Sequence, residues 1–492
     1  MKRFVKVISL LLSVVLLFSS CSGVNLDEEE STTVPVVTEK SPTVSDGVVT
    51  LPFNPTDSIN PFFAKSYENL YLCELIYESL YEIDSEYNVF GEIATSVVVN
   101  ENIARVTLSS GYSFSDLTAV KAQDVAYSFN LAKNSYAWAD CLSTILSATV
   151  ISDYVIDFEL AFKDIYVAGK LDFPIVKYGT ADEQINTPIG SGDYVFKEDK
   201  LIHEMNSSKE ILLYEIDTNE SSENAFKIGE TDVYFSDLSD CSFSAITGNT
   251  ESVLLNNMVY LGVNSKNGAL NRYVRSAIVA KLNCDDIAVS SYQGHAFATK
   301  IPVNPESKLI SEILTVDSKG NTEIANGILD RSGYTRWYGK VKTDGVYPLT
   351  MTLIVNEDNN YRVATAYSIA QSLEECGFGI TVETLPFDEY EQRIVAGNYD
   401  LYLGEIVLDG TFDLSAFFMS DSVLGKNINQ TESASVEYFR YRAGEITASE
   451  YYKAFVEDYP FIPICFRKGY VVNSADVNLK MLEMPFDLYS GL

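Results

Sequence analysis

The stretch NMVYLGVNSKNGALNRYVRSAIVAKL, residues 257–282, decides how this chain folds. Its first part, from Met258 to Val263, is an apolar run between two asparagines, which predicts a buried strand. A turn containing glycine follows, and apolar residues then recur at helical spacing, namely Val274, Ala277, Ile278 and Leu282. Because Arg272, Arg275 and Lys281 lie mostly on the other faces, the pattern predicts an amphipathic helix.

The order of residues in this stretch resembles a segment of a known protein family. Leu261-Gly262-Val263-Asn264, followed by Val274-Arg275-Ser276-Ala277-Ile278, is similar to a segment of the large extracytoplasmic solute-binding proteins of peptide, dipeptide and nickel ABC transporters. The resemblance implies an α/β fold with two lobes, of the periplasmic-binding-protein type, class II. It also implies that this segment carries the chain from the first lobe into the second, beside the ligand cleft.

Further motifs extend the resemblance, in the same order as in the family, over roughly residues 50 to 480. The segment 105–128 resembles the family's best-known signature, which implies an extra small subdomain in the first lobe. TPIGSGDYVF, at residues 187–196, resembles a glycine-rich turn of the family. A phosphate-binding loop is disfavoured there, because neither a helix pattern nor Gly-Lys-Ser/Thr follows.

The clearest secondary-structure pattern lies between Leu349 and Ile406. Alternating apolar residues predict a strand, and two further strands follow, each after a helical pattern. We expect Asp388 to be the N-cap of the second of these helices. The order strand, helix, strand, helix, strand predicts a parallel sheet with right-handed crossovers.

The N-terminal residues have the pattern of an export signal. Lys2, Arg3 and Lys6 precede a short apolar run, and Phe18-Ser19-Ser20-Cys21 resembles the bacterial lipobox. We therefore expect a signal peptide at 1–20 and a flexible tether at 21–48 that is lipidated at Cys21 and joined to the membrane. A plain secreted protein and an uncleaved anchor remain the alternatives.

The predicted division of the rest of the chain follows from the crossing. We expect lobe I at 49–262, including the small subdomain at about 85–175. Lobe II is expected at 263–468, and residues 469–492 are expected to return to lobe I.

Composition excludes several classes of function. The chain has 69 acidic and 35 basic residues and a formal net charge of −34, which argues against a nucleic-acid partner. Besides Cys21 there are six cysteines, without a C-x-x-C or a Cys/His cluster, so buried free thiols are favoured over a metal site or a disulfide framework. No cofactor is expected.

The inventory of catalytic residues also argues against an enzyme. There are only two histidines and no HExxH, GxSxG or P-loop motif, so catalysis would rest on carboxylates alone. A carboxylate pair of the glycosidase kind is always imaginable among so many acids, and it therefore carries almost no weight.

Candidate ligand-binding residues follow a predicted strand that ends near Gly404. In peptide-binding relatives the corresponding segment places a tryptophan against the ligand and an aspartate against its α-ammonium. The resemblance implies Asp409 as the amine anchor, although an ordinary loop carboxylate remains open, and Glu405 stands in place of the tryptophan. The other candidates are aromatic, for which core packing is an equal alternative: Phe412, Phe62 and Phe63.

We therefore predict a monomeric lipoprotein that captures a peptide outside the cell by lobe closure and delivers it to an ABC permease. The same fold could serve another solute, such as an oligosaccharide or a nickel chelate. A sensor or adhesion lipoprotein that no longer transports is the third possibility.

Overall fold

The structure is a computed structural model that describes residues 48–180, 188–197, 199–216, 219–243, 246–474 and 488–489. The predicted signal peptide, Cys21 and nearly all of the predicted tether lie outside the described residues. None of the helices in the described part of the chain is both long and apolar enough to cross a bilayer.

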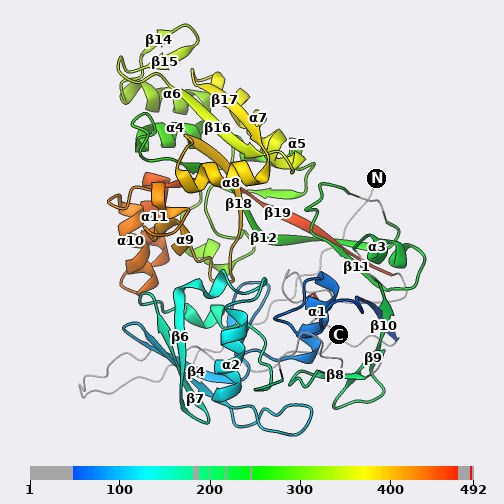
Figure 1. Cartoon of the computed structure of the whole chain (residues 1–492). Helices are drawn as coiled ribbons and strands as arrows, with labels where there is room; N and C mark the ends of the chain where they lie inside the picture. The colour runs from blue at the N-terminus through cyan, green and yellow to red at the C-terminus, as the bar shows by residue number, and fades with distance from the viewer. Residues whose placement is uncertain are drawn as a thin grey trace, which may run out of the picture.

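Two separate hydrophobic cores divide the described residues into two lobes (Figure 1). The first core contains buried side chains from Val49 to Leu255 and, much later in the chain, Val471, Leu488 and Tyr489. The second core contains buried side chains from Leu254 to Phe466. The two-lobe α/β fold is therefore confirmed.

The first lobe combines two small sheets. One has the order β1 (Val49–Phe53), β10 (Glu210–Glu215), β9 (Lys200–His203) and β8 (Tyr194–Lys197), and helix α1 (Tyr67–Ile76) packs against it. The other forms the small subdomain with helix α2 (Ala122–Ala132), and its order is β4 (Ala94–Asn100), β5 (Ile103–Leu108), β7 (Val155–Leu160) and β6 (Ile145–Ser152). Other elements of this lobe are β2 (Tyr81–Ile83), β3 (Val89–Gly91), α3 (Asn219–Lys227) and the 3-10 turns Cys141–Thr144 and Val167–Lys170.

A third sheet extends from one lobe into the other. Its order is β11 (Val233–Ser236), β19 (Phe461–Asn473), β12 (Asn249–Val263), β18 (Leu401–Val407), β16 (Thr350–Asn356) and β17 (Gly379–Leu385), with β13 (Ala296–Ala298) beside β19. The long strands β12 and β19 run antiparallel through both cores. They form the connection between the lobes.

Strand β12 contributes buried side chains to both cores. Val253 and Leu255 belong to the first core, whereas Leu254 and Met258 belong to the second. The pairing of β12 with β19 shifts register between Leu254 and Met258. Strand β12 begins well before the apolar run that predicted it. Its first residues are polar and exposed, so the apolar pattern could not indicate them.

The second lobe has the predicted β-α-β-α-β order, since β16 pairs in parallel with both β17 and β18. The connecting helices are α7 (Asn360–Glu374) and α8 (Phe387–Ala396). Asp388 is not the N-cap of α8, because the helix begins at Phe387 after Pro386. Its carboxylate lies in the first turn, where it suits the positive end of the helix dipole.

The other elements of the second lobe are α4 (Arg272–Lys281), α5 (Cys284–Ser290), α6 (Thr322–Arg331), β14 (Arg336–Tyr338), β15 (Val341–Thr343), α9 (Ser415–Phe418), α10 (Ser433–Arg442), α11 (Ala448–Asp458) and the 3-10 turns Lys308–Glu312 and Gly425–Asn427.

Helix α4 confirms the predicted helix but not its predicted polar face. Arg275 is 1% exposed, because its guanidinium donates to the backbone oxygens of Leu270 and Asp458 and pairs with Glu432. The arginine of the Val-Arg-Ser-Ala-Ile motif therefore joins α4 to the segments around α10 and α11. The six cysteines after Cys21 are free thiols, of which Cys73, Cys284, Cys376 and Cys465 are buried as predicted and Cys141 and Cys241 are only partly buried.

Two glycines let β12 and β18 lie close together. Gly262 faces Tyr402 across the strand pair, and Gly404 faces Tyr260. A Cβ atom on Gly262 would lie 2.0 Å from the Tyr402 ring. The two tyrosine hydroxyls are 3.1 Å apart. Each glycine thus leaves the space that the opposite ring fills.

Candidate functional site

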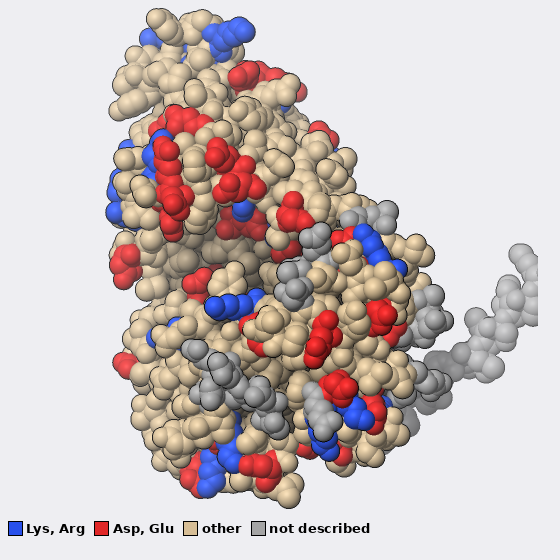
Figure 2. Space-filling view, turned by 45° about the vertical axis from the view of Figure 1, so that its right-hand side comes forward, with Lys and Arg blue, Asp and Glu red and all other residues tan. Residues whose placement is uncertain are grey.

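The surface is hollowed where the two halves of the molecule meet, and acidic side chains are prominent on the upper half (Figure 2). Strand β18 ends there at Val407, whose side chain is 55% exposed. Ligands in open α/β sheets usually bind beyond the carboxyl ends of strands. The residues around the end of β18 are therefore the first candidates for a solute site.

Glu405, on β18, is the centre of a polar network, which we call the Glu405 network. One carboxylate oxygen accepts hydrogen bonds from Asn257 at 2.7 Å and from Arg467 Nε at 2.8 Å, and the other accepts from Arg362 at 3.1 Å. Arg467 also donates to the backbone oxygen of Asp237 at 2.6 Å. Because Asp237 follows β11 in the first lobe, the network joins both lobes.

The two arginines of the network differ in how fully they are bonded. Burial alone would lower the pKa of Arg467, but the charges of Glu405 and Asp237 raise it above its ordinary value. Arg362 pairs with Glu405, yet its Nε is shielded from solvent and has no hydrogen-bond partner among the described residues. A buried donor of this kind is costly when left unbonded. The Arg362 side chain as a whole is 22% exposed, so another part of its guanidinium can meet an acceptor from outside the chain.

Tyr67, at the start of α1 in the first lobe, lies close to the network. Its side chain is 42% exposed, and its ring stacks on Tyr71 with centroids 6.2 Å apart. Burial raises the pKa of Tyr67 to about 12, and the negative charges of Asp237 and Glu405 contribute. An exposed aromatic ring thus lies beside charged groups of the second lobe.

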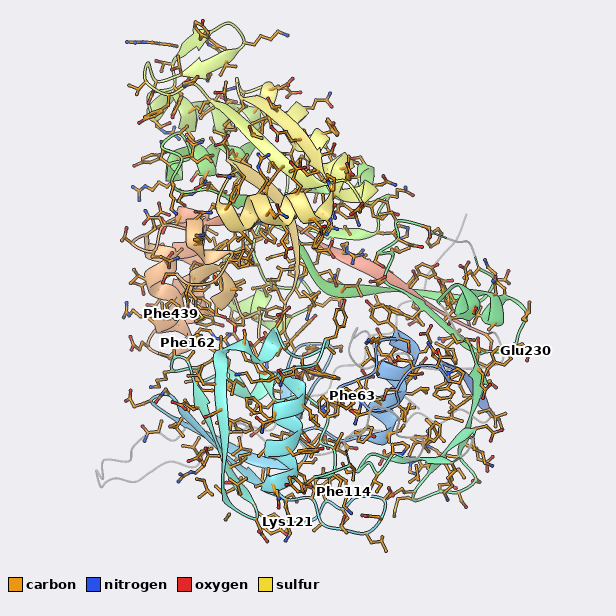
Figure 3. All side chains as sticks on the ribbon, in the orientation of Figure 1. Phe63, Phe114, Lys121, Phe162, Glu230 and Phe439 are labelled. Carbon is orange, nitrogen blue, oxygen red and sulfur yellow. The ribbon has the colours of Figure 1, made fainter. Side chains whose placement is uncertain are left out.

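The predicted phenylalanines of the first lobe are placed differently. Phe62 is 5% exposed and packs edge-on against Trp138, with ring centroids 5.6 Å apart. Phe63 is only partly buried and lies in the loop beside α1, on the side of the first lobe nearer to the second (Figure 3).

Five buried charged side chains, which we call the Lys170 cluster, lie where the small subdomain meets the second lobe: Lys170, Asp164, Asp409, Asp413 and Arg442. The Lys170 ammonium touches Asp413, lies 3.8 Å from both Asp164 and Asp409, and donates to Thr144 at 2.8 Å. Arg442 donates to Asp164 at 2.6 Å. Each of these five side chains is at most 9% exposed.

The electrostatics of the cluster favour its charged form. Burial alone would raise the pKa of Asp413, but Lys170 and Arg442 hold it well below its ordinary value. Burial would likewise lower the pKa of Lys170, whereas Asp413 and Asp409 raise it above its ordinary value. Asp413 and the Lys170 ammonium therefore keep each other ionised.

The remaining predicted residues, Asp409 and Phe412, share the loop after β18. One carboxylate oxygen of Asp409 accepts from the backbone nitrogens of Thr411 and Asp413, and the other faces Lys170. Phe412 is 4% exposed and packs against Tyr87 of the first lobe, with ring centroids 4.8 Å apart. Both residues thus contact the first lobe, and they are distinct from the Glu405 network.

Sequence reasoning missed the cations that surround the two predicted carboxylates. Arg467 and Lys170 each stand in a mainly apolar segment, FIPICFRKGYVV and IYVAGKLDFPIV, which also contain Lys468 and Asp172 respectively. A charge that is buried in such a run must find a partner, so this signal could have pointed to both segments, although not to the particular residues. Arg362 carries no comparable signal, because it lies near the start of a helix with polar neighbours.

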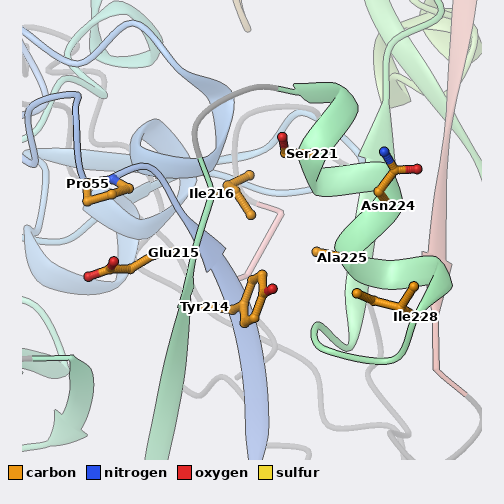
Figure 4. Close-up of a pocket in the computed structure, with 8 residues that line it drawn as sticks. All are labelled: Pro55, Tyr214, Glu215, Ile216, Ser221, Asn224, Ala225 and Ile228. Atoms are coloured by element: carbon orange, nitrogen blue, oxygen red, sulfur yellow. The ribbon is translucent and has the colours of Figure 1, made fainter.

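A separate surface pocket of about 460 Å³ lies within the first lobe (Figure 4). It is lined by Pro55, Tyr214, Glu215, Ile216, Ser221, Asn224, Ala225 and Ile228. No residue of the second lobe lines it, so lobe closure would not enclose a solute there.

Comparison with known proteins agrees with this architecture. The murein tripeptide-binding protein MppA, in its unliganded open form, is 18% identical, with a TM-score of 0.69 over 92% of this chain and 97% of that protein. The oligopeptide-binding protein AppA from Bacillus subtilis, in complex with a nonapeptide, is also 18% identical, with a TM-score of 0.59 over 92% of this chain and 99% of that one. NikA from Brucella suis, in complex with Fe(III)-EDTA, is 16% identical, with a TM-score of 0.65 over 90% and 99% of the two chains.

A search among curated proteins gave no match. A family model, described as bacterial extracellular solute-binding proteins, family 5 Middle, matches residues 88–427. Proteins of this family bind solutes outside the cytoplasm for ABC transporters and are not enzymes. The chain belongs to the bacterial extracellular solute-binding proteins of family 5.

Proposed function

We propose that this chain captures a peptide between its two lobes and delivers it to an ABC permease. The observation that carries this proposal is the Arg362 side chain of the Glu405 network, which is 22% exposed and so presents part of its guanidinium beyond its ion pair with Glu405. A peptide offers backbone carbonyls and a carboxylate, and either acceptor would bond this exposed part once closure removes water. The exposed ring of Tyr67 supplies an apolar wall on the opposite side.

The five predicted ligand contacts remain part of the proposal, with different roles. Glu405 and Phe63 are proposed to touch the solute directly, because both border the region between the lobes. Asp409 would meet a solute only if the solute replaced Lys170. Phe62 and Phe412 are proposed to support the walls of the cleft through Trp138 and Tyr87.

A metal chelate is the second candidate. The same arginine donor suits the carboxylates of a chelate, and NikA from Brucella suis, one of the similar structures, is in complex with Fe(III)-EDTA. This alternative differs from a peptide in the chemistry of the ligand and not in the residues that would meet it.

Identification of a co-purified ligand tests the proposal directly. The protein is purified without added solute and denatured, and the released small molecules are identified by mass spectrometry. Thermal unfolding with a peptide pool, with nickel–histidine and with oligosaccharides follows, because a ligand of the folded state raises Tm. We expect peptides to raise Tm. A shift with the chelate or the oligosaccharides and none with peptides would overturn the peptide assignment.

We further propose that the chain is a monomer held at the membrane by a lipid on Cys21. The lipobox-like Phe18-Ser19-Ser20-Cys21 supports this, as does the polar segment that separates it from the first lobe. The wild type and Cys241→Ala are expected to incorporate a labelled fatty acid, whereas Cys21→Ala is expected to incorporate none. Absence of label from the wild type, or equal labelling of Cys21→Ala, would exclude a lipid anchor on Cys21.

A further inference from the structure

The Lys170 cluster encloses a single ammonium group with groups from both lobes. Thr144 and Asp164 belong to the small subdomain of the first lobe, and Asp409 and Asp413 belong to the second lobe. The Lys170 side chain is 0% exposed, so its ammonium meets only these protein groups. Such a set of buried carboxylates and a hydroxyl is what a site for a primary ammonium ion requires, because a buried charge must be paired and hydrogen-bonded.

Negative charge is in excess around this ammonium. Three carboxylates of the cluster face two cations, and Arg442 is already bonded to Asp164 and to Thr411. Removal of the Lys170 ammonium would therefore leave carboxylates whose best replacement partner is another ammonium.

Contacts around the cluster fix the small subdomain against the second lobe. The backbone nitrogen of Ile165 donates to the backbone oxygen of Arg442 at 2.9 Å. The rings of Phe162 and Phe439 meet edge to face across the same contact, with centroids 5.0 Å apart (Figure 3). The site around the ammonium thus exists only while the two lobes are in contact here.

We propose that the Lys170 side chain is a tethered occupant of an ammonium-binding site that the two lobes form together, and that it takes the place of a solute amine there. The side chain supplies from within the chain the charge that would otherwise join the lobes at Asp409 and Asp413. Where the proposed function holds, the consequence is that a solute needs no free amine at this position. Peptides with a blocked N-terminus would then bind as well as free ones.

The test is replacement of the tethered amine by a free one. Lys170→Ala removes three methylenes and the ammonium, which together have the size of n-propylammonium. We expect this variant to unfold roughly 5–10 °C below the wild type, because it leaves buried carboxylates unpaired. n-Propylammonium chloride should restore part of the loss with saturation, whereas 1-propanol and tetramethylammonium chloride should not.

Lys170→Met is the matched control, because methionine fills most of the same space without a charge. It should be destabilised as well, yet it should gain nothing from n-propylammonium beyond the effect of equal sodium chloride. The proposal is overturned if Lys170→Ala is as stable as the wild type, or if 1-propanol or Lys170→Met gives the same recovery.

A second measurement needs no variant, so it remains decisive if Lys170→Ala does not fold. Acylation of lysine amines in the native protein, followed by mass spectrometry of peptides, reports how far each ammonium is enclosed. Lys170 should react far more slowly than Lys121 and Lys177, whose side chains are 45% and 26% exposed. Equal rates would overturn the proposal. Neither experiment contains a solute, so failure here is distinct from failure of the proposed function.

Discussion

A single substitution at Arg362 tests whether the Glu405 network binds the solute. Arg362→Met removes the Nε donor and the ion pair with Glu405, while it keeps most of the aliphatic part of the side chain. A charge-assisted hydrogen bond contributes about 1.5–3 kcal/mol, so we expect the Kd for the identified solute to rise by roughly 10- to 100-fold. Titration calorimetry on the purified variant measures this change.

The matched control for Arg362 is Arg440, which makes surface ion pairs with Glu437 and Glu445 on the second lobe. Arg440→Met should bind the solute as the wild type does, because exposed ion pairs contribute little. Equal Kd values for Arg362→Met and Arg440→Met would show that the solute does not use the Glu405 network.

Asp172 predicts a dependence of stability on pH. Burial, followed by the charge of Asp409, raises the pKa of Asp172 to about 7. Between about pH 4 and pH 7 the folded state therefore holds a proton that the unfolded state has lost, and the free energy of unfolding falls as the pH rises. Asp172→Asn should remove this loss, so it should be more stable than the wild type at pH 8, by at most about 4 kcal/mol.

Urea unfolding at pH 4 and pH 8 measures the effect of Asp172. The gain of Asp172→Asn should be small at pH 4, where Asp172 is protonated in the folded state. Asp421→Asn, at an exposed position, should show no such difference between the two pH values. A gain that is the same at both pH values would contradict the assignment to Asp172.

For single residues, the sequence indicated candidate carboxylates but not the groups that they meet. Glu405 and Asp409 became candidates because the segment at the end of a predicted strand resembles a ligand-binding segment of the family. Arg467 lies 62 residues after Glu405 in the sequence, and Lys170 lies 239 residues before Asp409. Such pairing depends on how two lobes meet, and no local pattern contains that information.

Among the elements, strands β12 and β18 make a prediction about packing. Gly262→Ala places a methyl group where the Tyr402 ring now lies, 2.0 Å from its nearest atom. The ring must move within a packed core, so we expect a loss of about 1–3 kcal/mol in the free energy of unfolding. Denaturant unfolding of the variant measures this loss.

Gly327→Ala is the control for Gly262, because Gly327 lies within helix α6 and an added Cβ would meet only Arg331 at an ordinary 3.6 Å. Alanine favours a helix more than glycine, so this variant should be as stable as the wild type or slightly more so. A Gly262→Ala variant with the stability of Gly327→Ala would show that the strands can separate at no cost.

The sheet strands β16, β17 and β18 and the helices α4, α7 and α8 could be predicted from periodicity, since their apolar positions repeat regularly. The length of β12 could not, because its first residues are polar and owe their strand conformation to pairing with β19. The burial of Arg275 was missed for a similar reason. Its partners, Asp458 and Glu432, come from distant segments that complete its hydrogen bonds.

For the whole molecule, the two tryptophans allow solute capture to be followed by fluorescence. Trp138 packs against Phe62 beside the proposed cleft, whereas Trp337 lies in the β14–β15 hairpin and is 57% exposed. We expect the identified solute to change the emission of the wild type and of Trp337→Phe. Trp138→Phe should lose the change, and a response carried by Trp337 alone would contradict a cleft beside Phe62.

The first lobe takes Val471, Leu488 and Tyr489 into its core, although these residues come after the whole second lobe in the sequence. Synthesis delivers every buried residue of the second lobe, up to Phe466, before it delivers these three. The half of the molecule that is made first is thus the last to acquire its complete interior. A nascent chain that stops after residue 468 is expected to have a finished distal half and an open proximal one, which quality-control proteases would recognise.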